Sequence, residues 1–388
     1  MLFGQSLPAL FAGFLVVAVH GAQANPTPVE TPHDKTGAIA IPAEPDLALL
    51  PRHRVAENLE NPRGVALLED ETLLVALAGQ GLRDDPGSGS LALLSDTTGD
   101  GVFETRRNIL HQLPSKNILE LVRRDEVFGM ADVVAGNDTL LVSAAFFGGP
   151  SQIYEVRDAE ATLWASVKGN INDLAYSKRD GNWIAVSSSS EQVLRVTRGK
   201  AAEEILTIPD LPEGQDPVPG YIHYEDSTGA VLVSLFSGSP LGEEGGDGTE
   251  IIHGAGGIIR VDTTNGAFEW LVSGLTAPTD IALDKEGRLY ILEFCSDFLD
   301  PVATREAMYR APVHGGFKRF SGRLLRVDLA SGKVEVLAHE LDGPTNLHLA
   351  EDAVFVTQGM GTPGRPIPYG DDAVALTGFI DKISLQSP

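Results

Sequence analysis

The sequence predicts an all-β protein folded as a six-bladed β-propeller, and three observations support this prediction. One phrase occurs six times along the 388 residues: an apolar strand, a turn rich in Asp, Gly, Glu or Asn, and a second apolar strand. Further strand pairs lie between the copies, which gives four strands to each unit. The two chain ends then complement each other, because the last unit lacks a strand that a segment before the first unit can supply.

The six copies of the phrase supply the first two strands of each blade. Strict alternation of apolar and polar residues is only partial, because strands covered on both faces read as apolar runs. In chain order the copies are NPRGVALLEDETLLVAL from Asn61, FGMADVVAGNDTLLVSA from Phe128, NINDLAYSKRDGNWIAVSS from Asn170, VPGYIHYEDSTGAVLVSLF from Val218, APTDIALDKEGRLYILEF from Ala277 and GPTNLHLAEDAVFVTQG from Gly343. The outer strand pairs of the first five units are GSLALLSD with FETRRNIL, SQIYEV with ATLWASV, QVLRVT with EEILTI, GGIIRVD with FEWLVSG, and GRLLRVD with KVEVLAH.

The sixth unit predicts how the ring closes. Only one clear strand, GFIDKISL, follows its phrase, and the segment HRVAENL, residues 53–59, precedes the first unit. We expect residues 53–59 to be the outer strand of the last blade, which leaves no exposed sheet edge at the closure. A β-sandwich is the alternative architecture, and it does not predict a missing strand at one end matched by a spare strand at the other.

The N-terminal region predicts export. An apolar run from Leu7 to Val19 is followed by Ala22-Gln23-Ala24, which is typical of a secretory signal cut before Asn25. We therefore divide the chain into a signal peptide over 1–24, a Pro-rich disordered linker over 25–50 and the propeller over 51–388. The expected location is secreted or periplasmic, with no membrane attachment after the signal is removed.

Charge and cysteine content exclude several kinds of partner and site. The chain carries 54 acidic and 29 basic residues, a formal net charge of −25, and such a surface repels the phosphates of nucleic acids. Cys295 is the only cysteine, so the chain has no internal disulfide and no metal site built on cysteine pairs. In its apolar context Cys295 is expected to be a small buried hydrophobic residue.

Aligning the six phrases places one residue of each blade at the same level, where the inner strand begins. These residues, here called the ring residues, are Gly64, Asp132, Asp173, Tyr221, Asp280 and Asn346. The carboxylates have two interpretations: they accept bonds from backbone N–H groups near the strand, or they bind a cation. The second interpretation predicts a divalent cation such as calcium, held by Asp132, Asp173, Asp280 and Asn346, and no other cofactor.

The long insertions of units one, four, five and six all join a second strand to a third, so they emerge at the same end as the ring. The insertion of unit five is basic and aromatic in an otherwise acidic chain, which favours an anionic or aromatic ligand. The alternative is that its basic residues pair with neighbouring acidic loops. The candidate ligand-binding residues are Tyr221, Arg305, Tyr309, Arg310, His314 and Lys318.

Catalytic signals are weak. The sequence contains neither a G-x-S-x-G elbow nor an H-E-x-x-H motif. His223, two residues after Tyr221, is the best-placed candidate general base, although a single histidine in an inner strand is more often a core residue.

The phrases NPRGVAL, APTDIALDKEGRLYILEF and LFSGSP, with GRLLRVDLASGKVEVLAHELDGPTNLHL, resemble the ScyD/ScyE-type group of exported propellers, which lies close to NHL-repeat proteins. The resemblance covers roughly residues 53–387 and implies the fold, and it lends no catalytic residues. The chain is also similar to gluconolactonase-like (SMP-30) propellers, which implies Asn172 as a further metal ligand. It departs from them because NPRG offers no Glu and Thr279 stands where an Asp belongs.

The sequence therefore predicts a secreted propeller that binds a small polar or aromatic ligand, or a partner, on the insertion-bearing face. Whether it is an enzyme stays open. A divalent-metal-dependent hydrolase of the lactonase type is the alternative. A quinoprotein sugar dehydrogenase ranks lower, because the catalytic His and basic quinone-binding residues of that class have no recognisable match here.

Overall fold

The structure is a computed structural model, and every regular element among the residues that it describes is a strand. No described segment is a helix long and apolar enough to span a lipid bilayer. The described residues are 34–81, 87–117, 125–145, 149–158, 160–212, 215–237, 253–297, 313–314, 317–369 and 372–386.

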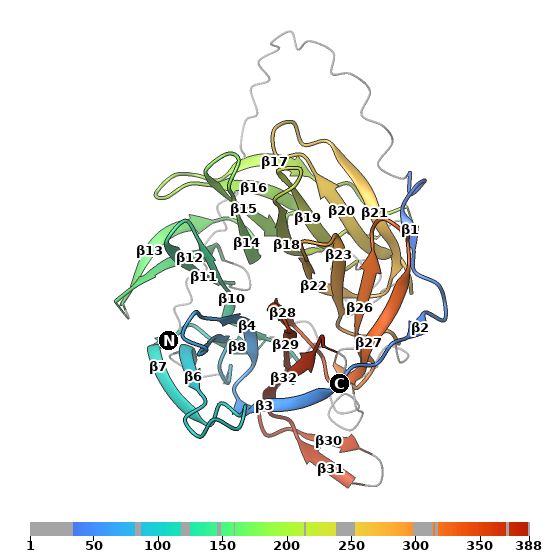
Figure 1. The fold of residues 1–388 in the computed structure, drawn as a ribbon. Helices are drawn as coiled ribbons and strands as arrows, with labels where there is room; N and C mark the ends of the chain where they lie inside the picture. The colour runs from blue at the N-terminus through green and yellow to red at the C-terminus, as the bar shows by residue number, and fades with distance from the viewer. Residues whose placement is uncertain are drawn as a thin grey trace, which may run out of the picture. The chain divides into compact units, whose positions relative to one another are not determined.

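Six antiparallel sheets stand around a common axis and form the blades of a propeller (Figure 1). The first three blades, from the inner to the outer strand, are β4 (Pro62–Leu67), β5 (Leu73–Leu77), β6 (Gly89–Ser95) and β7 (Thr105–Leu113); β10 (Met130–Gly136), β11 (Thr139–Ala144), β12 (Ser151–Arg157) and β13 (Glu160–Val167); and β14 (Ile171–Ser177), β15 (Asn182–Ser187), β16 (Gln192–Val196) and β17 (Glu203–Thr207).

The remaining blades follow the same order. They are β18 (Pro219–Glu225), β19 (Ala230–Leu235), β20 (Gly256–Val261) and β21 (Phe268–Leu275); β22 (Pro278–Leu283), β23 (Arg288–Glu293), β26 (Gly322–Asp328) and β27 (Val334–Leu341); and β28 (Asn346–Leu349), β29 (Ala353–Gln358), β32 (Gly378–Ser384) and β3 (Arg52–Leu59). Three short pairs lie outside the blades: β8 (Lys116–Asn117) with β9 (Val127–Phe128), β24 (Val313–His314) with β25 (Phe317–Lys318), and β30 (Pro366–Tyr369) with β31 (Asp372–Ala375).

Burial explains why the second strands read as continuous apolar runs. Every residue of β5, β19 and β29 is buried, because both faces of these strands are covered by neighbouring blades. One core cluster joins blades one and two through Leu74, Leu91, Met130 and Val142. Burying each such large side chain stabilises the fold by about 1.5–3 kcal/mol.

The predicted ring closure is confirmed. Strand β3 pairs antiparallel with β32, with Arg52 opposite Ile383 and Leu59 opposite Gly378. Val55, Ala56 and Leu59 of β3 lie in the core cluster shared by blades six and one. The N-terminal strand therefore completes the last blade, as the missing strand of the sixth unit indicated.

The structure differs from the prediction of a disordered linker over residues 25–50. Strand β1 (Ile39–Ala40) pairs parallel with β21, and β2 (Asp46–Leu47) pairs parallel with β27. Further bonds from Ile41 N–H to Ser273 O and from Leu50 N–H to Leu337 O continue both contacts. The described part of this segment thus adds a fifth strand to blades four and five, because their outer edges offer unpaired backbone groups.

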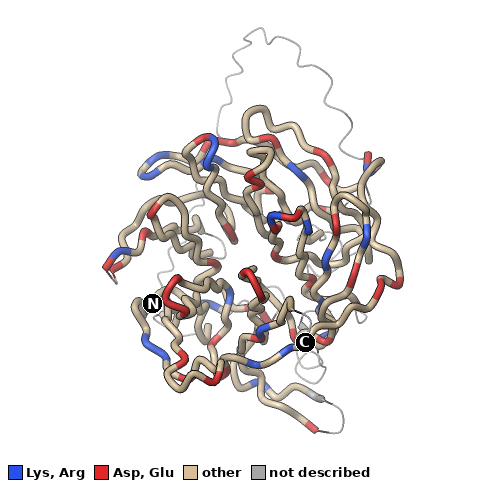
Figure 2. Tube along the Cα trace, in the orientation of Figure 1, with Lys and Arg blue, Asp and Glu red and all other residues tan. Residues whose placement is uncertain are grey.

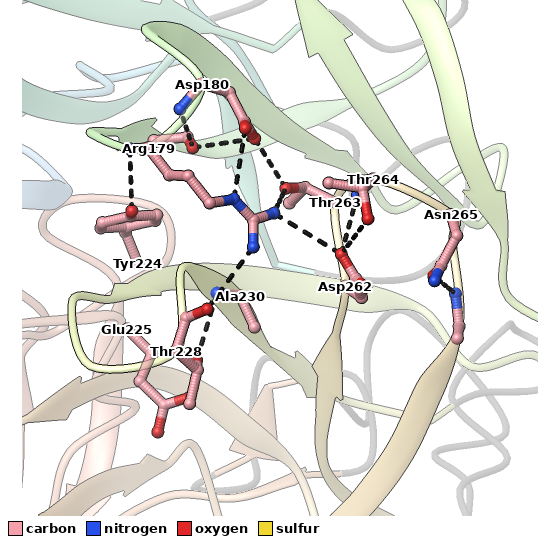
Figure 3. Close-up of polar contacts among 12 residues, drawn as sticks. Arg179, Asp180, Tyr224, Glu225, Thr228, Ala230, Asp262, Thr263, Thr264 and Asn265 are labelled. Carbon is pink, nitrogen blue, oxygen red and sulfur yellow. Dashed lines mark hydrogen bonds and ion pairs between the residues drawn. The ribbon is translucent and has the colours of Figure 1, made fainter.

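Polar side chains join blades three and four through the turns between their strands (Figure 3). The guanidinium of Arg179 donates to Asp180 Oδ1 at 3.2 Å, to Thr228 O at 3.4 Å and to Thr263 Oγ1 at 2.8 Å. Its backbone N–H donates to the hydroxyl of Tyr224 at 3.0 Å. The guanidinium therefore links the β14–β15 turn of blade three to two turns of blade four.

Acidic positions outnumber basic ones along the chain (Figure 2), as the counts of 54 and 29 require. Many of the described basic side chains are engaged in ion pairs, such as Arg260 with Glu225 at 2.8 Å and Arg326 with Glu335 at 2.7 Å. A basic side chain that lines a cavity is therefore informative in this protein.

Candidate ligand site at the mouth of the propeller

The structure brings the ring residues together. Asn346 Nδ2 donates to Asp132 Oδ1 at 3.3 Å, although the two residues lie 214 positions apart. A Cβ added to Gly64 would lie 2.5 Å from Asp132 Oδ1, so blade one has room only for glycine at this level. The alignment of the phrases therefore placed these side chains correctly at the start of the inner strands.

Ring side chains bond the backbone of their own blade and of the next one. Asp173 accepts the N–H of Leu174 at 2.5 Å and that of Ile222, in blade four, at 2.9 Å. Asp280 accepts the N–H of Ile281 at 2.7 Å and that of Leu347, in blade six, at 2.8 Å. The ring side chains therefore join neighbouring blades. A carboxylate suits this position because each of its two oxygens can accept one backbone N–H group.

Asn346 repeats this pattern where the ring closes. Its Oδ1 accepts the N–H of Val65, in blade one, at 2.9 Å. Thr345, one residue earlier, donates its hydroxyl to Pro62 O at 2.9 Å. Blades six and one, which are far apart in sequence, are thus joined by two polar contacts beside the strand pairing of β3 and β32.

The three carboxyls of the ring are buried and crowded, and both conditions disfavour charge. Burial, and next the charge and the hydrogen bond of Asp173, hold the pKa of Asp132 well above its usual range. Burial and the charge of Asp173 do the same to the pKa of Asp280. Burial also raises the pKa of Asp173, and bonds from Asp132 and from backbone N–H groups oppose this shift.

The ring residues do not fit a divalent ion well. Both oxygens of Asp173 and both of Asp280 already accept backbone N–H groups, and Asn346 Oδ1 accepts another. Among the described residues no group of three His, Cys, Asp or Glu side chains is arranged to hold a metal. These contacts leave the ring oxygens little capacity to bind a metal ion, and the calcium site stays a prediction.

Two cavities lie along the axis, on opposite sides of the ring. The channel cavity, of about 390 Å³, is lined by the inner strands below the ring and by Asp132, Asp173, Asp280 and Asn346. The mouth cavity, of about 150 Å³, is lined by Tyr221, by residues that precede the ring position or follow the second strands, and by residues of other segments such as Glu126 and Phe317. Asn172 lines the mouth cavity, so the predicted metal ligands are divided between the two cavities.

Aromatic side chains form one wall of the mouth cavity. Phe294 and Phe317 meet edge to face with ring centroids 5.1 Å apart, and Phe236 and Phe317 do so at 5.6 Å. Phe128, Phe236, Phe294 and Phe317 all line the cavity, together with the thioether of Met360. This wall offers apolar surface and ring edges to a bound molecule.

One cation and one anion also line the cavity. The side chain of Arg63 is 12% exposed, and its Nη1 lies 3.4 Å from Glu126 Oε1 and 2.6 Å from Met360 Sδ. The Nε of Arg63 is buried and bonds no group among the described residues. Burial raises the pKa of Tyr221 well above its usual range, and the nearby Arg63 opposes this shift.

Two buried ion pairs fix the loops around the cavity. Arg319 and Asp342 form a two-pronged pair at 2.6 and 2.7 Å, and Arg319 Nη1 donates to Met360 O at 2.8 Å. Arg365 Nε lies 2.7 Å from Asp125 Oδ2, with both side chains nearly inaccessible. Because breaking a buried pair costs about 3–5 kcal/mol, these loops are held firmly.

The backbone of Val218, on the cavity wall, is strained. Its φ of 44° lies in the left-handed region, which a β-branched residue rarely adopts. The conformation is held by the bond from Phe236 N–H to Val218 O at 3.1 Å and that from Ser237 N–H to Pro217 O at 3.1 Å. Strain of this kind persists where surrounding structure enforces it and is common at functional sites.

The predicted ligand-binding residues have different outcomes. Tyr221 lines the mouth cavity, whereas Lys318 is exposed and pairs with Asp297 at 2.7 Å. The neighbouring Arg319 forms an ion pair with Asp342. Lys318 and Arg319 thus pair with acidic side chains, which is the alternative interpretation of the basic insertion given above. Arg305, Tyr309, Arg310 and the side chain of His314 lie outside the described residues.

His223 lies on the other side of the ring, in the channel cavity. Burial lowers its pKa to about 4, although Asp226 and Glu225 act in the opposite direction. A histidine with this pKa is neutral at pH 7 and is a weak base. The structure therefore offers no support for His223 as a general base acting in the mouth cavity.

The sequence analysis missed Arg63, Glu126 and the aromatic wall, although two periodic signals pointed to part of them. In every blade except the second, the residue before the ring position lines the mouth cavity, and in blade one this residue is Arg63. The residue after the second strand lines it in three blades: Ser188, Phe236 and Phe294 occupy this position in blades three, four and five. Glu126 follows no such repeat, so only the fold reveals it.

No family model matches the sequence, and no curated protein sequence matches it either. Solved structures do match. A Bacteroides thetaiotaomicron protein of unknown function is 14% identical with a TM-score of 0.51, over 85% of this chain and 75% of that one. A putative glucose dehydrogenase from Thermus thermophilus is 15% identical with a TM-score of 0.49, over 85% and 99%. Virginiamycin B lyase from Staphylococcus aureus is 11% identical with a TM-score of 0.46, over 87% and 99%.

At these identities the likeness concerns the fold alone. The chain is a six-bladed β-propeller, and its solved neighbours are propellers with unrelated chemistries.

Proposed function

We propose that the protein is an exported propeller of the ScyD/ScyE type that binds a small polar or aromatic ligand in the mouth cavity. The observation that carries this proposal is the cavity itself, which is centred on the axis and lined by Tyr221 and the phenylalanine wall. Its volume of about 150 Å³ equals that of an apolar protein cavity known to hold one benzene molecule. Export to the periplasm or the medium rests on the signal sequence at residues 1–24.

The enzymatic alternatives receive less support from the residues present. A lactonase of the SMP-30 type needs a divalent ion, and the ring oxygens are already committed to backbone N–H groups. A quinoprotein needs several basic side chains around its cofactor, and Arg63 is the only one among the described residues that line the mouth cavity. A binding protein requires neither.

The experiment is a thermal-shift screen of small aromatic acids, amides and sugars against the purified protein and two variants. Asn170 lines the cavity, so Asn170→Trp should fill it, while Lys168→Trp places the same side chain two residues away at an exposed position. A ligand present at 100 times its Kd stabilises the folded state by about 2.7 kcal/mol.

We expect at least one compound to raise the Tm of the wild type and of Lys168→Trp, and to leave Asn170→Trp unchanged. A compound that stabilises Asn170→Trp equally binds elsewhere, and a screen without any hit contradicts small-ligand binding. In the latter case a protein partner on this face becomes the better hypothesis.

A further inference from the structure

The mouth cavity contains a donor that the protein leaves unused. Arg63 Nε is buried and bonds no described group, although leaving a buried guanidinium N–H without an acceptor is unfavourable. Its contact with Glu126 is long, at 3.4 Å, and involves Nη1 rather than Nε. Arg63 also lines the mouth cavity with a side chain that is 12% exposed, so a planar acceptor can reach the exposed part of the guanidinium, and carboxylates fit a guanidinium edge with two parallel bonds.

The surroundings of Arg63 restrict the rest of such a molecule. Phe236, Phe294 and Phe317 form a continuous aromatic wall of the same cavity. The volume of about 150 Å³ allows one six-membered ring with a small substituent.

We propose that the mouth cavity binds a single-ring aromatic carboxylate, with its carboxylate on the guanidinium of Arg63 and its ring against Phe236, Phe294 and Phe317. This inference rests on the proposed function and specifies the charge and size of the ligand.

Two features oppose an anion. Glu126 is a neighbouring negative charge, and its side chain is 16% exposed, against 12% for that of Arg63. The net charge of −25 is spread over the whole molecule, and charges beyond about 8 Å are largely screened at 0.15 M salt. A direct, partly buried bond to a guanidinium is screened much less.

Three probes of nearly identical shape isolate the charge. Benzoate, benzamide and benzamidinium carry a planar substituent on the same ring and differ in charge, which is negative, zero and positive. Binding of each is measured by calorimetry at pH 7 and 0.15 M salt to wild type, Arg63→Met, Arg63→Lys and Glu126→Gln. Arg63→Met keeps an apolar side chain of similar length and removes the guanidinium. Arg63→Lys keeps the positive charge without the two-pronged geometry, and Glu126→Gln removes the neighbouring negative charge while the guanidinium stays.

We expect the wild type to bind benzoate about tenfold or more tightly than benzamide, as one charged bond allows, and benzamidinium least. Arg63→Met should lose this preference, Arg63→Lys should keep part of it, and Glu126→Gln should strengthen it. Since Glu126→Gln is isosteric, its result counts even if the Arg63 variants fold poorly.

Equal binding of benzoate and benzamide, or tightest binding of benzamidinium, overturns the inference while the proposed function stands. Failure of all three probes, when the thermal-shift screen yields another ligand that Asn170→Trp excludes, also overturns the inference alone. Failure of the probes together with an empty screen overturns both.

Discussion

Replacing Asp132 by asparagine is expected to stabilise the protein at neutral pH. Asp132 faces the carboxyl of Asp173, and burial together with this neighbour raises its pKa well above the usual 3.8. An asparagine of the same shape can accept the bond from Asn346 Nδ2, which Asp132 accepts at 3.3 Å, and can donate its own N–H to Asp173. The substitution removes a disfavoured charge and keeps one side-chain oxygen to accept the bonds from Asn346 Nδ2 and from the N–H of Val133.

The magnitude follows from linkage. A carboxyl whose pKa is higher in the folded than in the unfolded state stabilises the fold below its unfolded pKa, and this contribution is lost as pH rises through the folded pKa. Each unit of elevation corresponds to about 1.4 kcal/mol in the free energy of unfolding at higher pH. We therefore expect Asp132→Asn to be more stable than the wild type at pH 7, with a gain that shrinks toward pH 4.

Thermal melts of wild type and variant between pH 4 and pH 8 measure this difference, because titration of all other groups cancels between them. Asp280→Asn is the matched control. Both oxygens of Asp280 accept backbone N–H groups, so an amide there must turn its NH₂ toward a donor. The Asp280→Asn variant makes the same change in charge as Asp132→Asn but loses a buried hydrogen bond. We expect this loss to lower the free energy of unfolding by about 1–3 kcal/mol.

The reasoning fails if Asp132→Asn is destabilised at pH 7 and if calcium raises the Tm of the wild type but not of the variant. That result would show that a cation, rather than a proton, compensates the ring, and it would support the calcium site predicted from the sequence. Equal melting with calcium and with EDTA is expected instead.

Three further predictions concern the frame around the site. Deleting residues 34–50 should lower the Tm and leave the far-UV spectrum of the propeller, because β1 and β2 only extend blades four and five. Cys295 should resist alkylation in the native state and react once denaturant is added, since it is 0% exposed and burial raises its pKa well above 9. Arg179→Ala should cost about 1 kcal/mol in urea unfolding, because its side chain makes several bonds between blades but is 36% exposed. A larger loss than this would mean that the β14–β15 turn holds the two blades together more than the exposure suggests.

The fold could be predicted because its signals are local and repeated. Each phrase combines a short apolar run with a turn, and the closure by β3 followed from counting strands at the two chain ends. The additions on blades four and five could not be predicted. Strands β1 and β2 are two residues each within a Pro-rich segment, and they exist only because the edges of β21 and β27 accept them.

The site was predicted only in part, because sequence alignment gives the level of a residue along a strand but not the side of the ring that it faces. Asp173 and Asn172 are adjacent, yet one lines the channel cavity and the other lines the mouth cavity. Arg63 received no weight because it appears in a single blade. Its importance comes from Glu126 and Met360, which reach it from distant parts of the chain.

Tyr221 is the largest side chain among the ring residues. At the other ring positions stand glycine, aspartate or asparagine, whereas Tyr221 is an aromatic side chain that is 4% exposed. It lines the mouth cavity and interacts electrostatically with Arg63 above and with the three ring carboxyls. Both oxygens of Asp173 and of Asp280 accept backbone N–H groups, so these carboxyls join neighbouring blades. Under the proposed function, we therefore expect recognition of a ligand to depend on Arg63 and the aromatic wall rather than on the ring carboxyls.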